Sequence, residues 1–244
     1  MIDRQVMLIA GATGSIGAAI ARLASAQGWA VVVHGRDLEK VSALVAELGS
    51  TAGAAVFNTW ADDCAEQLIA AAAAHHGRLD AVIDCVSTGR GGITGLFRDT
   101  DPASYTDFFG LSAAWFQRLA HAAYPHLAQR GGTLIAFASD AGRFAAPRQT
   151  IIGAARAAVM GFVRNLAVEA ARDGIRAHCI SPSFVAGSTS AAMMGSSRMA
   201  KAEERSGLGL PTAEDIAPLA LFLCGDGAAK ITGQVISVNG GLNA

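Results

Sequence analysis

The stretch Val6-Met-Leu-Ile-Ala-Gly11-Ala-Thr-Gly14-Ser-Ile-Gly17 decides the fold class. An apolar run of strand length ends at Gly11, and a helical pattern begins near Ile16. In this context the glycines give a tight turn, let the backbone approach a pyrophosphate, and let helix and strand pack closely. The start of the helix adds free N–H groups that favour phosphate. We therefore expect a dinucleotide to bind through Gly11, Thr13, Gly14, Ser15, Ile16 and Gly17; the alternative is a plain strand–helix turn.

Short apolar runs alternate with longer amphipathic runs along the rest of the chain. The apolar runs lack polar alternation, which is typical of strands covered on both faces of a sheet. The pattern predicts an α/β fold, a Rossmann-type doubly wound parallel sheet of about seven strands, in a single domain over residues 1–244. The expected strands are 6–10, 30–34, 53–57, 81–85, 133–138, 175–180 and 234–238, and the expected helices are 16–27, 37–48, 62–76, 111–129 and 150–172.

Residues 186–209 are the least regular segment, rich in Ser, Met and Gly. We expect them to form a mobile substrate lid rather than a core element. Within the lid, Arg198, Lys201 and Arg205 are spaced for one helical face, which fits either the phosphate of an acyl carrier or a solvated face. Arg143 and Arg148 are expected either to hold an anionic substrate or to face solvent.

Charge and composition exclude several classes of partner. The net charge is −1 and no five like charges follow one another, which argues against nucleic acid and anionic membrane surfaces. No uninterrupted apolar run is long enough to cross a bilayer, and no signal peptide precedes the first strand. The four Cys form no C-x-x-C pair and no metal-ligand spacing, so we expect free thiols, no metal and a cytoplasmic protein.

The end of the second strand, His34-Gly35-Arg36-Asp37, bears on the choice of cofactor. Sites that favour NAD place an acidic side chain here to hold the ribose 2′-OH, whereas an Arg suits a 2′-phosphate. Gly35 has no side chain and Arg36 follows it, so NADP(H) is favoured over NAD(H). The alternative is that Arg36 only solvates the helix start and Asp37 is its N-cap. Asn58, after the third strand, is a further candidate beside the adenine.

At this point the sequence resembles the short-chain dehydrogenase/reductase family over nearly its whole length. The resemblance is carried by the glycine loop, by residues 77–80 and 131–142, by Ser181-Pro182, and most closely by residues 211–241. It implies NAD(P)-linked oxidation of alcohols or reduction of carbonyls on a small-molecule substrate. It also implies a homo-oligomer, a dimer or more often a homotetramer.

The family's catalytic residues Asn, Ser, Tyr and Lys are only partly present. Ser139 matches the Ser, but the Tyr position holds Ile152, the Lys position Arg156 and the Asn position Ser112. Asp84 stands where the family has the first Asn of its turn after the fourth strand. With two Tyr and three Lys in the chain, no shift of register restores the pair.

A different proton donor is therefore required if the protein turns over. We expect Ser139, Asp140 and Arg156 to be catalytic, with Ser139 orienting a carbonyl oxygen and Arg156 also contacting the ribose of the nicotinamide. Asp140 and Asp84 each follow a strand, where such folds bind ligands, so either is a candidate acid, and Asp84 also a cofactor contact. The alternative for both is a cap or turn.

Three functions follow from these residues. The first is an NADP(H)-dependent oxidoreductase whose proton comes from Asp140, Asp84, water or the substrate itself. The second is a non-catalytic NADP-binding sensor or partner in a hetero-oligomer. The third is a non-redox enzyme that uses the same pocket.

Overall fold

The computed structural model describes residues 4–87 and 91–243, which form a seven-stranded sheet in the order β3-β2-β1-β4-β5-β6-β7. All neighbouring strands are parallel, so the expected doubly wound Rossmann-type sheet is confirmed. The strands are β1 (Val6–Ala10), β2 (Ala30–Gly35), β3 (Gly53–Val56), β4 (Ala81–Asp84), β5 (Gly132–Phe137), β6 (Ile175–Pro182) and β7 (Val235–Val238).

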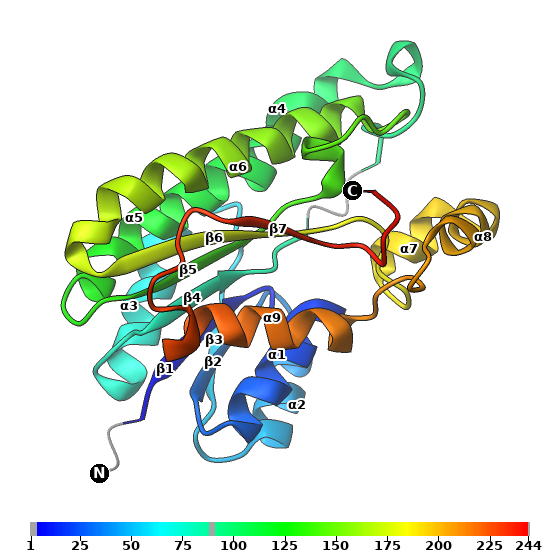
Figure 1. Cartoon of the computed structure of the whole chain (residues 1–244). Coiled ribbons are helices and arrows are strands. Elements are labelled where there is room, and N and C mark those ends of the chain that lie inside the picture. Colours follow the sequence, from blue (N-terminus) through cyan, green and yellow to red (C-terminus); the bar gives the residue numbers. More distant parts are fainter. Residues whose placement is uncertain (1–3, 88–90, 244) are drawn as a thin grey trace.

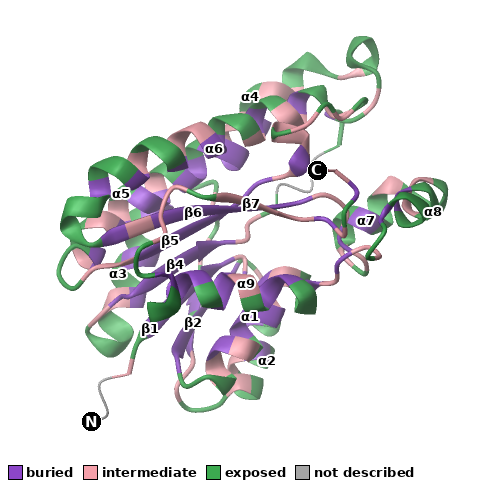
Figure 2. Cartoon of the chain, viewed as in Figure 1, coloured by how far each residue is buried: buried purple, intermediate pink, exposed green. Residues whose placement is uncertain are grey.

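Two helical layers cover the sheet (Figures 1 and 2). Strand β1 shows why, because Val6 and Leu8 join one apolar cluster while Met7 and Ile9 join the other. A strand buried on both faces must be apolar throughout, as its sequence is. On one face lie α3 (Cys64–His76), α5 (Trp115–Leu127) and α6 (Thr150–Ala170), and on the other α1 (Ser15–Ala26), α2 (Leu38–Leu48) and α9 (Ala213–Cys224).

The structure differs from the expected elements in three places. The expected helix 111–129 begins earlier, as α4 (Tyr105–Phe109), and passes through one π-helical stretch, Gly110–Ala114, before α5. Residues 186–209, expected to be irregular, instead contain α7 (Thr189–Met194) and α8 (Ser196–Arg205), which lie beyond the carboxyl ends of the strands (Figure 1). Helix α9 was not among the expected helices; Thr212 and Asp215 form a capping box at its start, and Pro218 lies inside it.

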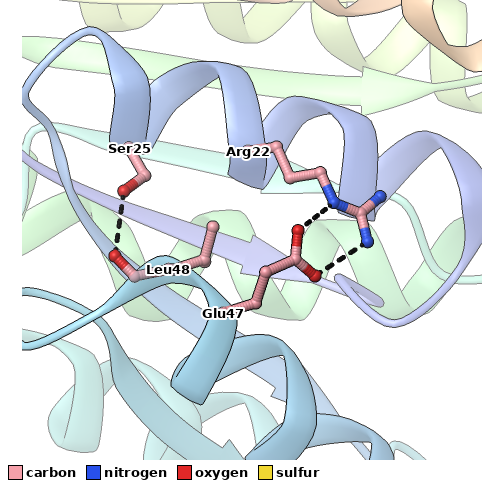
Figure 3. A network of polar contacts seen from close by, with 4 residues as sticks. All are labelled: Arg22, Ser25, Glu47 and Leu48. Carbon is pink, nitrogen blue, oxygen red and sulfur yellow. Dashed lines mark hydrogen bonds and ion pairs between the residues drawn. The ribbon is translucent and has the colours of Figure 1, made fainter.

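The first two helices are joined by side chains as well as by packing. Arg22 on α1 donates from Nε and Nη2 to the two carboxylate oxygens of Glu47 on α2, at 2.6 and 3.0 Å (Figure 3). Ser25 Oγ donates to the carbonyl oxygen of Leu48 at 3.3 Å, one turn further along α1 (Figure 3). Because the ion pair is half exposed, it contributes little to stability and mainly fixes the angle between the helices.

One helix, residues Thr150–Asp173, is long and apolar enough by length and composition to cross a membrane. In the fold it includes α6, and Ile151, Val159, Val163 and Ala167 are buried. Val159, Val163 and Ala167 belong to the cluster that packs on the sheet. One face of this helix therefore packs on the sheet.

Candidate active site

The glycine loop joins β1 to α1 at the carboxyl edge of the sheet. Gly11 has a φ of +75°, and a Cβ there would lie 2.9 Å from the backbone of Cys85. A Cβ on Gly17 would lie 2.5 Å from the carbonyl oxygen of Gly11, so helix and turn meet too closely for any side chain. Gly14 and Ser15 are exposed, and no side chain caps α1. The uncapped helix start fits a pyrophosphate, as the sequence predicts.

His34, on β2, holds this loop in place, a role that the sequence did not indicate. The N–H of Gly11 donates to His34 Nδ1 at 3.1 Å, so Nε2 carries the ring proton and donates to the carbonyl oxygen of Phe57 at 3.3 Å. Burial lowers the pKa of His34 to about 4, which keeps the ring neutral and Nδ1 an acceptor. The ring also stacks with Trp115, with centroids 6.5 Å apart.

The end of β2 is tightly packed at the position where an NAD site would need an acidic side chain. A Cβ on Gly35 would lie 3.0 Å from the side chains of Thr13 and Val41. Asp37 is the N-cap of α2 and accepts from the N–H groups of Glu39 and Lys40. The sequence-based alternative that Asp37 caps this helix is therefore confirmed.

Two other side chains from the predicted cofactor set lie along the same edge. Arg36 is exposed and makes no ion pair with any carboxylate in the described part of the chain. Asn58 follows β3, and its Oδ1 accepts from the N–H of Trp60 at 3.2 Å. Both therefore lie beyond the ends of strands at the edge that holds the glycine loop.

Asp84 ends β4, next to the glycine loop, because Ala10 and Asp84 are paired across the sheet. Its Oδ1 accepts from the N–H of Val86 and from Trp115 Nε1, each at 3.1 Å. Burial raises the pKa of Asp84 to about 6, and these two donors and the charge of Arg156 limit the rise. The carboxyl group therefore gains and loses its proton not far below neutral pH.

Arg156 lies where the family has Lys and faces the same interior. Its Nη1 donates to the carbonyl oxygens of Phe137 at 3.0 Å and Ser112 at 3.4 Å. Burial lowers the pKa of this guanidinium, and the nearby carboxyl of Asp84 opposes that effect. The Ser112 hydroxyl is buried without a hydrogen-bond partner among the described residues. Asp84, Arg156 and Ser112 are thus brought together on the inner side of the site.

Ile152, at the Tyr position, presents no proton. It packs against a small apolar cluster that includes Ile93, Phe108, Ile151 and Ala155. Tyr105 and Phe109 pack against the same cluster, and the hydroxyl of Tyr105 is hydrogen-bonded to Thr100 Oγ1. The surroundings of Ile152 are therefore largely apolar.

Asp140 is enclosed by three hydrogen-bond donors from the last part of the chain. Its Oδ1 accepts from Ser181 Oγ at 3.0 Å and from Ser237 Oγ at 2.6 Å, and its Oδ2 accepts from Asn239 Nδ2 at 2.6 Å. The carboxylate is 2% exposed. These three hydrogen bonds tie the turn after β5 to β6 and to the end of the chain around β7.

Ser139 lies beside Asp140 and keeps a free hydroxyl hydrogen. Its Oγ accepts from the N–H of Ala141 at 3.3 Å, which leaves the O–H able to donate elsewhere. Arg143, by contrast, donates to Ser237 Oγ and to the carbonyl oxygen of Val235, so its guanidinium lies against β7. Arg148, the other Arg between Ser139 and Ile152, has a backbone φ of +73°, in the left-handed region.

A cavity of about 230 Å³ opens beside Ser139. Its walls come from the loop after β5, the segment after β6, helix α8 and the last residues of the described chain. Asp84, Ile152 and Arg156 do not line it. Within the described residues, no three His, Cys, Asp or Glu side chains are grouped as a metal site.

The chain is similar to known proteins along almost its full length. Residues 11–243 match the family described as Enoyl-(Acyl carrier protein) reductase. Nodulation protein G of Rhizobium sp. (strain N33) is 31% identical over 238 residues, covering 96% of this chain and 95% of its own. Short-chain reductase protein NovJ of Streptomyces niveus is 31% identical over 251 residues, covering 98% and 94%.

A solved structure has the same fold. It is that of a short-chain type dehydrogenase/reductase from Mycobacterium ulcerans, which superimposes with a TM-score of 0.91 at 24% identity. The match covers 98% of this chain and 90% of the other.

Proposed function

Because this chain belongs to the short-chain dehydrogenase/reductase family, whose members bind NAD(P) and act on small molecules, we propose that it is an NADP(H)-dependent oxidoreductase of a carbonyl or alcohol substrate with a non-standard proton donor. When bound, the nicotinamide supplies the hydride. The residues of this chain must then bind the cofactor, orient the carbonyl and admit a proton.

The end of β2 carries the preference for NADP(H). Gly35 has no acidic side chain to hold a ribose 2′-OH and its position is tightly packed, and Asp37 is engaged as a helix cap. Arg36 is the exposed cation beside that position, and its guanidinium suits a 2′-phosphate. The single observation that supports NADP(H) most directly is that Arg36 is exposed at the end of β2 and makes no ion pair with a carboxylate in the described part of the chain.

Ser139 and water supply the polar chemistry at the carbonyl. The free hydroxyl hydrogen of Ser139 faces the cavity and donates to the carbonyl oxygen. Asp140 has both oxygens occupied and Asp84 does not line the cavity, so water entering the cavity is the proton source we favour. Arg156 keeps positive charge next to the site and positions the ribose, and Asp84 sets the electrostatics around it.

The assembly and compartment are part of the same proposal. Members of this family form oligomers, and we infer a homo-oligomer, a dimer or tetramer, for this chain. The four free cysteines, three of them buried, fit a reducing cytoplasm.

Titration with NADPH and NADH, followed by fluorescence, tests the cofactor preference. Wild-type protein is expected to bind NADPH more tightly, and the Arg36→Asp variant to lose that preference. Consumption of NADPH with a panel of small carbonyl compounds then tests turnover. Failure of both nucleotides to bind would overturn the proposal.

A second function is favoured by the apolar cluster around Ile152. A site that has lost its acid and packed the position with aliphatic side chains suits a protein that binds NADP(H) without turnover, as a sensor or a hetero-oligomer partner. Tight NADPH binding with no consumption on any carbonyl would favour it. The non-redox alternative is favoured only if a reaction proceeds without either nucleotide.

A further inference from the structure

Three cations of helix α8 face the cavity beside Ser139. Arg198, Lys201 and Arg205 all line it, and their spacing places them on one side of the helix. Glu203 and Glu204, on the same helix, do not line the cavity. The sequence allowed these three cations either to contact a ligand or to face solvent. In the structure they form part of the wall of a cavity.

No carboxylate neutralises these cations in the described part of the chain. None of the three takes part in an ion pair there. Asp140 is the one acidic residue among those that line the cavity, and its oxygens already accept from Ser181, Ser237 and Asn239. Three cations against one carboxylate leave a net positive charge on the wall of this cavity of about 230 Å³.

The remaining walls suit the body of a small molecule. Phe144, Pro147, Phe184 and Leu242 add apolar surface to the same cavity. A ligand that fills the cavity therefore meets the hydroxyl of Ser139, apolar side chains and cations. Guanidinium groups bind carboxylate and phosphate oxygens through paired N–H donors, which few neutral groups can match.

We propose that the substrate is a small anionic carbonyl compound, whose carboxylate or phosphate group binds Arg198, Lys201 and Arg205 while its carbonyl oxygen reaches Ser139. The inference rests on the proposed function for the carbonyl end only. The oxyanion site itself is independent of turnover, so the two are tested separately.

The binding experiment compares matched probes by calorimetry with the whole protein, with and without saturating NADP⁺. The carboxylate pair is 4-oxopentanoate and its methyl ester, and the phosphate pair is dihydroxyacetone phosphate and dihydroxyacetone. NADP⁺ is included because the exposed Arg36 is a second place where an anion can bind. We expect the anion of at least one pair to bind about 10-fold or more tightly than its neutral partner, and the preference to weaken with salt.

The variants separate cavity charge from total charge. Replacing Arg198, Lys201 and Arg205 together by Gln keeps a good helix former at each position and should abolish the preference for the anion. The matched control, Glu203→Gln with Glu204→Gln, should leave it intact, and NADPH affinity should be unchanged in both. Circular dichroism checks that α8 and the fold persist.

Two results would overturn the anionic site: equal binding of anion and neutral partner in both pairs, or a preference that survives the triple substitution. The two pairs distinguish a carboxylate from a phosphate as the group recognised. Anion binding without NADPH consumption would leave the site standing while counting against the redox proposal. Failure of NADPH to bind would count against the proposed function alone.

Discussion

Trp115 donates a hydrogen bond from its indole Nε1 to Asp84 Oδ1 across 3.1 Å, while its ring stacks against His34. One side chain from α5 therefore touches both the carboxyl group at the end of β4 and the imidazole that holds the glycine loop. Asp84 and His34 are both buried, and both have a shifted pKa. Because the pKa of each group is shifted in the folded protein, the free energy of unfolding depends on pH. The ionisation of each group can therefore be measured through stability.

Asp84→Asn should change how stability depends on pH. The pKa of Asp84 is raised from 3.8 to about 6, so its contribution to folding is present below pH 3.8 and is lost as the pH rises through 6. The free energy of unfolding of the variant, relative to wild type, should therefore rise over this range by at most ~3 kcal/mol. Urea denaturation at several pH values measures it. A constant difference across the range would contradict the burial of an ionisable carboxyl at this position.

His34→Gln should remove a pH dependence of the opposite sign. The pKa of His34 is lowered from 6.5 to about 4, so its contribution is present above pH 6.5 and is lost as the pH falls through 4. His178, whose pKa is also lowered to about 4, acts in the same direction. As the pH falls, the two histidines together lower the free energy of unfolding. In the variant this decrease should be roughly half as large.

The same substitution should weaken cofactor binding, because the Gly11 N–H loses its Nδ1 acceptor. We expect a higher dissociation constant for NADP⁺ at pH 7 in His34→Gln than in wild type. The matched control is His178→Gln, which removes a buried histidine far from the loop in sequence. An equal loss of NADP⁺ affinity in both variants would show that His34 acts only through stability.

Two glycine substitutions should separate packing from ligand binding. Ala at position 17 places a Cβ 2.5 Å from the Gly11 carbonyl oxygen, whereas Ala at position 14 has its nearest neighbour at 3.5 Å. Gly17→Ala should therefore lose ~1–3 kcal/mol of stability as well as NADPH affinity. Gly14→Ala should keep its stability and lose affinity, because its methyl group occupies space beside the pyrophosphate. Thermal denaturation and NADPH titration of the two variants side by side test this, and equal stability losses would count against the packing account.

Restoring the family's pair should raise turnover. Ile152→Tyr with Arg156→Lys introduces a positioned acid and a cation able to lower its pKa. A positioned acid typically accelerates such a reaction by about 10² to 10⁴-fold, so kcat should rise if a carbonyl substrate is consumed at all. Ile152→Phe with Arg156→Lys is the control, since it has the ring without the hydroxyl. Equal rates for the two double variants would mean that proton supply does not limit the reaction.

The sequence predicted most strands and helices of the protein, because these depend on the local pattern of apolar residues and glycines. The predicted strand 6–10 is the strand observed, since five apolar residues followed by Gly11 leave little choice. Residues 186–209 were harder to predict, because their composition indicated an irregular segment, whereas the structure has two short helices separated by Gly195, whose φ is +83°. Helix α9 was missed; Pro218 lies inside it, where proline removes a backbone hydrogen bond, and the capping box of Thr212 and Asp215 is the signal that could have found it.

The site was only partly predictable, since its contacts join residues far apart in the chain. The motif position identified Ser139, Ile152 and Arg156. The bonds of His34 to Gly11 and of Trp115 to Asp84 span 23 and 31 positions and depend on which strands are neighbours. Asp140 was expected to be a free acid or a simple cap, and its three partners could not be assigned without the order of β5, β6 and β7.

The bonds that enclose Asp140 also impose an order in time. Ser237 and Asn239 follow Asp140 by 97 and 99 positions, and Asn239 Nδ2 donates in turn to the carbonyl oxygen of Asn243. On a ribosome, Ser139 and its turn are synthesised long before the residues that hold them in place. A chain that stops before residue 237 would therefore keep Ser181 as the one of these three donors to Asp140.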